Sequence, residues 1–164
     1  MHEGAAFSDT GSIDTGNWET LLCRGAQEVF EMMIGVPLRR CQGSDARAAG
    51  EFTAVIGLAG PVNGVFAMRC DSRTALGIAC GMLGVDEAAA SGEVWDALGE
   101  ACNMVIGNFK GKTGRAGEST ALSVPTVIHG HEYRVRPLIN GSFVECRMET
   151  GDGALHLRLD YRLG

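Results

Sequence analysis

The sequence predicts an α+β domain, a mixed α/β layered fold in which long helices pack on a mostly antiparallel sheet. Helix-like and strand-like segments follow one another in the order helix, strands, helices, strands, which is typical of a layered mixed fold. The strand-like runs are short and separated by Gly, Pro and Asn turns, as in antiparallel hairpins. The chain has 164 residues, 45% of them hydrophobic and 21% charged, which is the composition of one globular domain.

The first element is a helix preceded by a polar segment. Residues 1–16 are rich in Gly, Ser, Thr and Asp, so we expect a flexible leader before a single domain at residues 17–164. Asn17 is suited to cap the helix, and Gly35 followed by Pro37 is suited to end it. The predicted core-facing side of this helix carries Trp18, Leu21, Leu22, Gly25, Val29, Met32 and Met33.

The remaining elements alternate between strands and helices. Asp71 or Ser72 can cap a helix that Gly84 ends, and a longer helix is predicted from about Gly92 to Lys110. A Gly/Pro/Asn turn at 60–64 indicates a hairpin. The predicted strands are 36–42, 51–60, 65–71, 121–128, 132–139, 142–150 and 154–162.

The two longest predicted helices resemble each other. When the sequence is shifted by 72 residues, 27–35 lies over 99–107 with four identities, among them Glu28 with Glu100 and Gly35 with Gly107. The same shift places Val55-Ile56 over Val127-Ile128. An ancient duplication of a helix-plus-strands unit explains these matches and predicts a pseudo-symmetric fold. The two copies differ at the position where the later helix has Asn103 and the earlier helix has Glu31.

Charge and cysteine usage exclude several classes of function. The formal net charge of −6 opposes binding to nucleic acid, and no basic cluster longer than Arg39-Arg40 offsets it. The longest apolar run is too short to cross a membrane, and the first residues lack the pattern of a secretory signal, so we expect a cytoplasmic protein. The six cysteines have no paired spacing, and we expect buried, reduced thiols rather than disulfides or a zinc site.

The helix at 92–110 carries two lines of residues. Trp95, Leu98, Cys102, Val105 and Phe109 cluster on a predicted core face. A second line of residues lies about 140° away on an ideal helix and consists of Asp96, Glu100, Asn103 and Gly107. A solvated polar face would give the same spacing, so the spacing alone does not establish a site.

The pattern D-x3-E-x2-N with a distant proline, here Asp96, Glu100, Asn103 and Pro125, resembles that of the CheC/CheX/FliY family of phosphatases that act on phosphorylated CheY. The segments GEACNMVIGNFKG, EVFEMMIGVPL, GLAGPVNGVFAMRC and LSVPTVIHG resemble other parts of that family. The likeness covers about residues 17–161, and a single motif resembles the CheX branch. Between Asn103 and Pro125 lie 21 residues, one fewer than the family pattern, which affects the loop at 111–118.

The resemblance implies an enzyme that hydrolyses the aspartyl phosphate of a CheY-like receiver domain in chemotaxis or another two-component pathway. Asn103 would orient the attacking water, and Glu100 would dock against the receiver's lysine. Asp96 and Gly107 would contact the partner, although Asp96 also suits the first turn of a helix and Gly107 a helix-packing contact. The resemblance implies no cofactor bound by this chain, with Mg²⁺ supplied by the receiver, and it implies a homodimer.

Two other classes of function were weighed. A non-catalytic module that binds a receiver or the flagellar switch could keep the same face, but it would need no paired Glu100 and Asn103. A small-molecule or redox domain would need a Gly-rich strand-to-helix loop or paired cysteines. The turn at 60–64 lacks the ending of a phosphate-binding loop, and His129 and His131 have no third ligand nearby in sequence.

Overall fold

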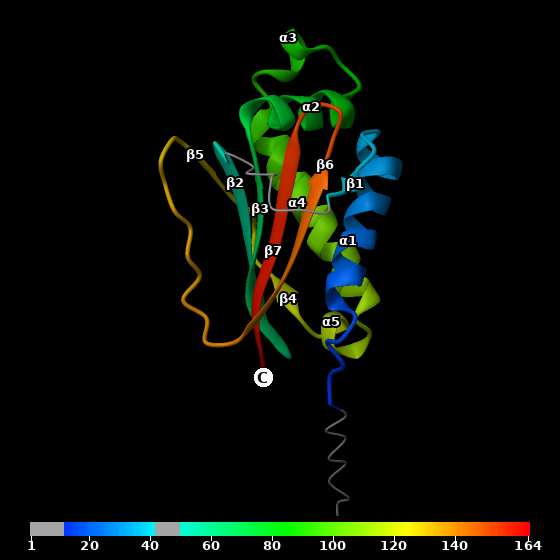
Figure 1. Cartoon of the computed structure of the whole chain (residues 1–164), viewed down its shortest axis with the longest axis vertical. Helices are drawn as coiled ribbons and strands as arrows, with labels where there is room; N and C mark the ends of the chain where they lie inside the picture. The colour runs from blue at the N-terminus through cyan, green and yellow to red at the C-terminus, as the bar shows by residue number, and fades with distance from the viewer. Residues whose placement is uncertain (1–11, 42–49) are drawn as a thin grey trace, which may run out of the picture.

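A seven-stranded antiparallel sheet forms one layer of the molecule in the computed structural model, which describes residues 12–41 and 50–164 (Figure 1). The sheet order is β1-β6-β7-β3-β2-β4, and β5 pairs with β2 on the same edge as β4. The strands are β1 (Arg39–Arg40), β2 (Phe52–Ala59), β3 (Val62–Cys70), β4 (Ala121–Leu122), β5 (Thr126–His129), β6 (Ser142–Glu149) and β7 (Ala154–Leu163). The predicted α+β class is therefore confirmed.

The helices form the second layer; in Figure 1, α4 runs behind the strands and α1 lies at the right, beside β1 and β6. They are α1 (Trp18–Val29) continued by the π-helix η1 (Phe30–Ile34), α2 (Ser72–Leu83), α3 (Glu87–Ala90), α4 (Val94–Lys112) and α5 (Arg115–Glu118). The Asp71 side chain caps α2 by accepting from the Thr74 amide at 2.8 Å. Gly35 and Gly84 end their helices in the left-handed conformation, as predicted from the sequence.

Strand alternation places the core between the two layers. On β2, Phe52, Ala54, Ile56 and Leu58 are buried, and they face the helices. The buried residues of β7 alternate in the same way. The Cys102 thiol of α4 lies 3.6 Å from the Ala54 carbonyl oxygen, so α4 packs directly on β2. The other face of the sheet has no helix of the described chain on it, and it carries the polar residues of β6 and β7 (Figure 1).

The sheet order has the predicted pseudo-symmetry. When the sheet order is read from the opposite edge, β5 takes the place of β1, β2 that of β6, and β3 that of β7. In the same correspondence α4 takes the place of α1. The prediction that the 72-residue shift also relates the strands was wrong. β2 and β5 are neighbours in the sheet rather than equivalents, and Ala54 pairs with Val127. The equivalent of β2 is β6, which lies further along the chain than the helix shift places it.

The buried side of the first helix differs from the prediction at its end. Trp18, Leu22 and Val29 are buried as expected, but Met32 and Met33 are exposed, and Phe30 and Ile34 are buried instead. The cause is the π-helical turn at Phe30–Ile34, which adds one residue to the turn and shifts the buried position from 33 to 34.

Three strand predictions failed in part or entirely, and of the described part of 36–42 only Arg39–Arg40 is a strand. The run 121–128 is divided into β4 and β5 because Pro125 lacks the amide hydrogen that a continuous ladder needs. The run 132–139 is not a strand at all. Its Tyr133 hydroxyl hydrogen-bonds to the Thr53 hydroxyl at 2.7 Å, and Arg69 lies over the Tyr133 ring at 5.3 Å. The segment therefore packs on the sheet face instead of extending its edge.

The prediction of reduced cysteines was wrong for one pair. Cys23 of α1 and Cys146 of β6 form a disulfide between the helical layer and the sheet. Both residues are buried, so the buried position was predicted but the bond was not. The spacing of 123 residues carries no sequence signal for this contact, because only the fold brings the two residues together.

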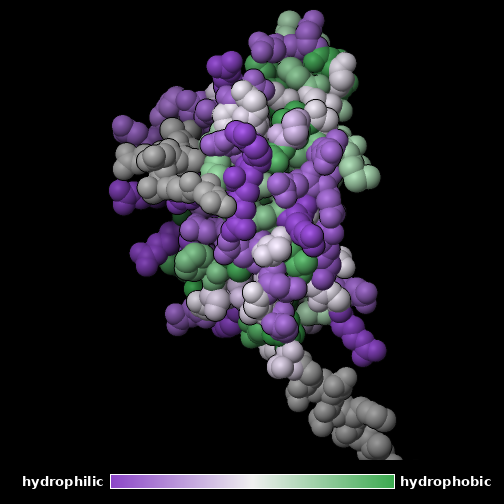
Figure 2. Space-filling view, turned by 45° about the vertical axis from the view of Figure 1, so that its right-hand side comes forward, coloured by the Kyte–Doolittle hydropathy of each residue, from purple (hydrophilic) through white to green (hydrophobic). Residues whose placement is uncertain are grey.

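The surface is mixed in character. Figure 2 shows a mostly hydrophilic face with hydrophobic residues scattered over it, some of them at the end that carries α2 and α3. Leu83 and Val85, at the end of α2, are among the exposed apolar residues. Within the described ranges, no helix has the length and hydrophobicity that a bilayer crossing requires. The predicted leader at 1–16 lies mostly outside the described residues, and its extent stays a prediction.

Candidate functional site on helix α4

Helix α4 presents a line of polar residues directly opposite its buried face. Asp96 and Glu100 are exposed, and Asn103 and Gly107 are half-buried. The buried side is formed by residues such as Leu98, Cys102, Val105 and Phe109. Because residues three apart on a helix lie about 5–6 Å from each other, the Glu100 and Asn103 side chains stand next to each other on the outside of the domain.

Trp95 was predicted in the core, and that prediction was wrong. It is 48% exposed, although it lies in an aromatic cluster with Phe52 and His129. The His129 ring stacks on Phe52 with centroids 4.1 Å apart, and the Trp95 ring meets both edge-on at 5.8 Å. The strands supply this support, so helical periodicity alone could not place the ring.

Pro125 packs against α4 at Gly99, one residue before Glu100. A Cβ atom built on Gly99 would lie 3.2 Å from Pro125 Cγ and 3.5 Å from Pro125 Cβ. Only glycine allows this approach without a shift. The proline singled out by the sequence pattern is therefore brought beside the polar line of α4 despite the 21-residue separation.

Hydrogen bonds hold the segment before Pro125 on the sheet. The Ser123 amide donates to the Gly57 carbonyl oxygen, and the Gly57 amide donates to the Ser123 hydroxyl oxygen, both at 2.9 Å. The Ser123 hydroxyl also donates to the Val124 carbonyl oxygen at 2.9 Å. This backbone is therefore fixed relative to β2, and so is the position of Pro125.

Gly107 has open space around it. Nothing lies within 4 Å of a Cβ atom built at this position, so the structure gives no support to a helix-packing role. Asp96 lies in the first turn of α4, where a carboxylate interacts favourably with the helix dipole. Both residues are in line with Glu100 and accessible to a partner.

The corresponding part of α1 is arranged differently. Glu28, the counterpart of Glu100, pairs with Lys112 at 2.8 Å, and the Asn108 amide lies 3.5 Å from it. These contacts, first among them the hydrogen bond from Lys112, lower the pKa of the Glu28 carboxyl. Glu31 is exposed in the π-helical turn. The first copy therefore has no free pair of an acid and an amide.

The cysteines near α4 do not suit nucleophilic chemistry. Burial raises the pKa of Cys102 to about 12, and burial raises the pKa of Cys70 to about 12. Both remain protonated thiols at neutral pH, and a thiol is a weak nucleophile. Among residues 12–41 and 50–164, no three His, Cys, Asp or Glu side chains come together as a metal site.

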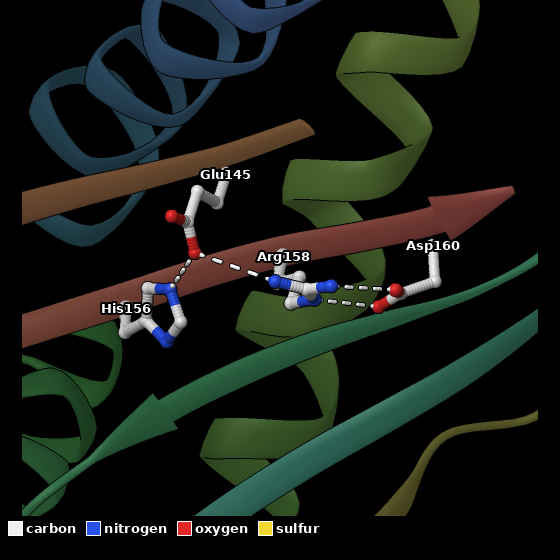
Figure 3. Close-up of polar contacts among 4 residues, drawn as sticks. All are labelled: Glu145, His156, Arg158 and Asp160. Carbon is white, nitrogen blue, oxygen red and sulfur yellow. Dashed lines mark hydrogen bonds and ion pairs between the residues drawn. The ribbon is translucent and has the colours of Figure 1, made fainter. Parts of the chain in front are cut away.

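A second polar cluster, missed by the sequence analysis, lies on the helix-free face of the sheet (Figure 3). Arg158 binds Asp160 through two hydrogen bonds of 2.8 and 2.9 Å and lies 3.6 Å from Glu145. His156 is 3.0 Å from the same Glu145 oxygen. The alternation of His156, Arg158 and Asp160 along one strand is the signal that could have found it. Its charged groups are paired with one another, so the cluster is satisfied internally.

The model of the family "Chemotaxis phosphatase CheX" matches residues 52–149, which is more than half of the chain. The chain belongs to the CheX family. No curated protein matches the sequence at a significant level.

Solved structures agree in fold. A chemotaxis protein CheX from Vibrio vulnificus is 23% identical, with a TM-score of 0.76 over 89% of this chain and 99% of that one. A CheX from Desulfovibrio desulfuricans is 20% identical, with a TM-score of 0.73 and coverage of 89% and 99%. The CheX–CheY–BeF3–Mg²⁺ complex from Borrelia burgdorferi matches at 20% identity and a TM-score of 0.69, covering 92% and 99%. Membership of this family implies a phosphatase that acts on phosphorylated CheY.

Proposed function

We propose that this protein hydrolyses the aspartyl phosphate of a CheY-like receiver domain by inserting the polar line of α4 into the receiver's phosphorylated pocket. The observation that carries the proposal is the placement of Glu100 and Asn103, side by side and opposite the buried face of one long helix. Family membership supplies the class of substrate, and the Borrelia complex shows that a CheX can be crystallised with CheY, BeF3 and Mg²⁺.

The chemistry needed from this chain is small. In the reaction a water oxygen forms a bond to phosphorus and the bond from phosphorus to the aspartyl oxygen breaks, which gives the free carboxylate and inorganic phosphate. The receiver contributes its Mg²⁺ and a lysine that contacts the phosphoryl oxygens. What remains is to hold the water in line, and positioning of this kind lowers a barrier by several kcal/mol without proton transfer.

Asn103 is suited to this task. Its carboxamide oxygen accepts a hydrogen bond and its nitrogen donates, so one side chain can fix the orientation of a water. A carboxylate at the same place would repel the phosphoryl oxygens, which is why Glu31 is a poor counterpart. Pro125 beside Gly99 limits the space on one side of the helix, and this helps to define the approach of the receiver.

Glu100 is suited to docking. A carboxylate that meets the receiver's lysine away from bulk water makes a short charge-assisted hydrogen bond and fixes the register of the helix in the pocket. Asp96 and Gly107 extend the contact one turn to either side, and Gly107 admits a close backbone. A homodimer stays a prediction of the family resemblance.

The test is dephosphorylation of purified CheY-like receivers by the purified protein, with and without Mg²⁺. We expect faster release of phosphate than the receiver's own decay, dependent on Mg²⁺. A hundredfold acceleration corresponds to about 2.7 kcal/mol. If the protein binds a phosphorylated receiver without accelerating its decay, it is instead a binding module of the same fold, and the catalytic proposal is wrong.

A further inference from the structure

We propose that an apolar rim beside the polar line of α4, consisting of Trp95, Val124 and Pro125, is the surface on which the receiver docks, and that Trp95 is its anchor. The inference rests on the proposed function, because the occupant is the same receiver domain that Glu100 and Asn103 enter.

The rim is apolar and open to solvent. Val124 is 82% exposed and Trp95 is 48% exposed, and Pro125, next to Val124 in the chain, is exposed as well. These side chains come from two elements that meet at Gly99, where Pro125 packs on α4. Covering large apolar side chains that are exposed to water in the free protein favours binding. Each square ångström of apolar surface buried contributes about 25 cal/mol.

The rim lies within reach of the proposed site. On an ideal helix Trp95 is about 12 Å along the axis from Asn103 and about 80° round it, toward the side on which Pro125 packs. A specific interface covers about 800 Å² on each partner, equivalent to a disc about 16 Å in radius. A receiver whose pocket receives Glu100 and Asn103 therefore covers Trp95 and Pro125 at Gly99 as well, and Val124 follows Pro125 directly in the chain. Leu138 is also 93% exposed, but it lines a hollow with Asn63 and Arg162 that includes no residue of α4.

The rim is held rigid before binding. Phe52 and His129 fix the Trp95 ring edge-on at 5.8 Å, and Ser123 fixes the backbone of Val124 and Pro125 through its hydrogen bonds to Gly57. The Trp95 ring therefore has little side-chain entropy left to lose on docking, so most of its burial contributes to affinity. Tryptophan in a supported, partly desolvated position is the residue type most often found to dominate binding energy.

The rim and the polar line differ in their physical contribution. Glu100 acts through charge, so its contribution falls as salt is added. Trp95 and Val124 act through burial of apolar surface, which moderate salt leaves nearly unchanged. The salt dependence of binding therefore distinguishes a loss of docking on the rim from general damage to helix α4.

The experiment measures binding of CheY-like receivers, locked with beryllofluoride and Mg²⁺, at about 0.05 and 0.5 M salt. We expect Trp95→Ala to weaken binding about tenfold or more at both salt concentrations and to raise KM much more than it lowers kcat. Val124→Ser should weaken binding about threefold, and it tests the rim without touching the core. Leu138→Ser is the matched control and should bind as wild type. Glu100→Gln should weaken binding mainly at low salt.

The outcomes distinguish the two proposals. If Trp95→Ala and Val124→Ser bind as tightly as wild type while Asn103→Ala loses turnover, the proposal that the receiver docks on the rim is wrong and the proposed function stands. If wild type neither binds nor dephosphorylates the receivers, the proposed function is overturned and the rim with it. Equal weakening by Leu138→Ser would also overturn the rim. Thermal unfolding of each variant shows whether a loss of binding reflects a loss of fold.

Discussion

Gly99 is the residue on which the geometry of the site depends. It is buried, and Pro125 lies against it where any other residue would carry a Cβ atom. A proline ring is tied to its own backbone, so a Cβ atom at Gly99 requires Pro125 or the helix to shift by a few tenths of an ångström. Glu100 and Asn103 follow directly on the helix, so a shift here moves the residues of the proposed site.

We therefore expect Gly99→Ala to lower the rate of receiver dephosphorylation severalfold. The gain in helix propensity, about 1 kcal/mol, is offset by overpacking that costs about 1–3 kcal/mol. Urea unfolding and phosphate release from a phosphorylated receiver measure the two effects. A variant that is both more stable and fully active would show that the contact with Pro125 is not needed.

Gly107 offers the contrasting substitution. Its Cβ position is open, so Gly107→Ala should stabilise the isolated protein by about 1 kcal/mol through helix propensity alone. If the receiver backbone approaches here, the added methyl group should weaken binding of the receiver at the same time. Denaturant unfolding and receiver titration on one preparation test both parts. Unchanged binding would remove Gly107 from the contact surface.

At the scale of elements, the two related helices have diverged at their ends. Gly35 ends the first helix, whereas its counterpart Gly107 lies inside α4, which continues to Lys112. The first helix also changes to a π turn, and its Glu28 is paired with Lys112. The first copy therefore supports the packing of α4 rather than repeating its chemistry.

Restoring the amide to the first copy should not create a second site. We expect Glu31→Asn to leave phosphate release per chain at the wild-type rate, because the carboxylate of Glu28 stays bound to Lys112 and the π turn changes the relative direction of the two side chains. Adding Glu31→Asn to Asn103→Ala should leave the slow rate unchanged. Recovery of turnover in that double variant would contradict this reading of the duplication.

Much of the element order could be predicted from the sequence, and the failures have local causes. Capping residues and helical periodicity gave the bounds of α2 and α4 closely, because these signals are local. The π turn was missed because it depends on the close approach of the Ile34 backbone to Gly81 of α2. Glu100, Asn103 and Pro125 were found as a pattern. The supports of the site, which are Gly99 under Pro125 and Phe52 under Trp95, depend on contacts between segments far apart in the chain.

For the whole molecule, the Cys23–Cys146 disulfide joins the two layers across 123 residues of chain. It crosses the core between α1 and β6, and it does not touch the polar line of α4. A cross-link that closes so long a loop acts mainly by restricting the unfolded chain. Its effect should therefore fall on stability rather than on the phosphatase reaction.

We expect reduction to lower the free energy of unfolding by about 4–5 kcal/mol, a large part of the total for a domain of this size. The measurement is the urea midpoint with and without a thiol reductant, and Cys41→Ser, which removes a thiol outside the pair, is the control. In the double variant Cys23→Ser/Cys146→Ser the reductant should have no effect. Six titratable thiols in the unfolded, unreduced protein would show that the bond is not formed.

The proposed reaction depends on one amide on the outside of α4, that of Asn103, which would position the water that attacks a receiver's phosphate. The most direct measurement is single-turnover release of phosphate from a phosphorylated CheY-like receiver by excess wild type and by Asn103→Ala, together with the affinity of each for the receiver locked with beryllofluoride. We expect a rate at least tenfold lower for the variant, about 1.4 kcal/mol or more, with affinity nearly unchanged. Equal rates for the two proteins would contradict it.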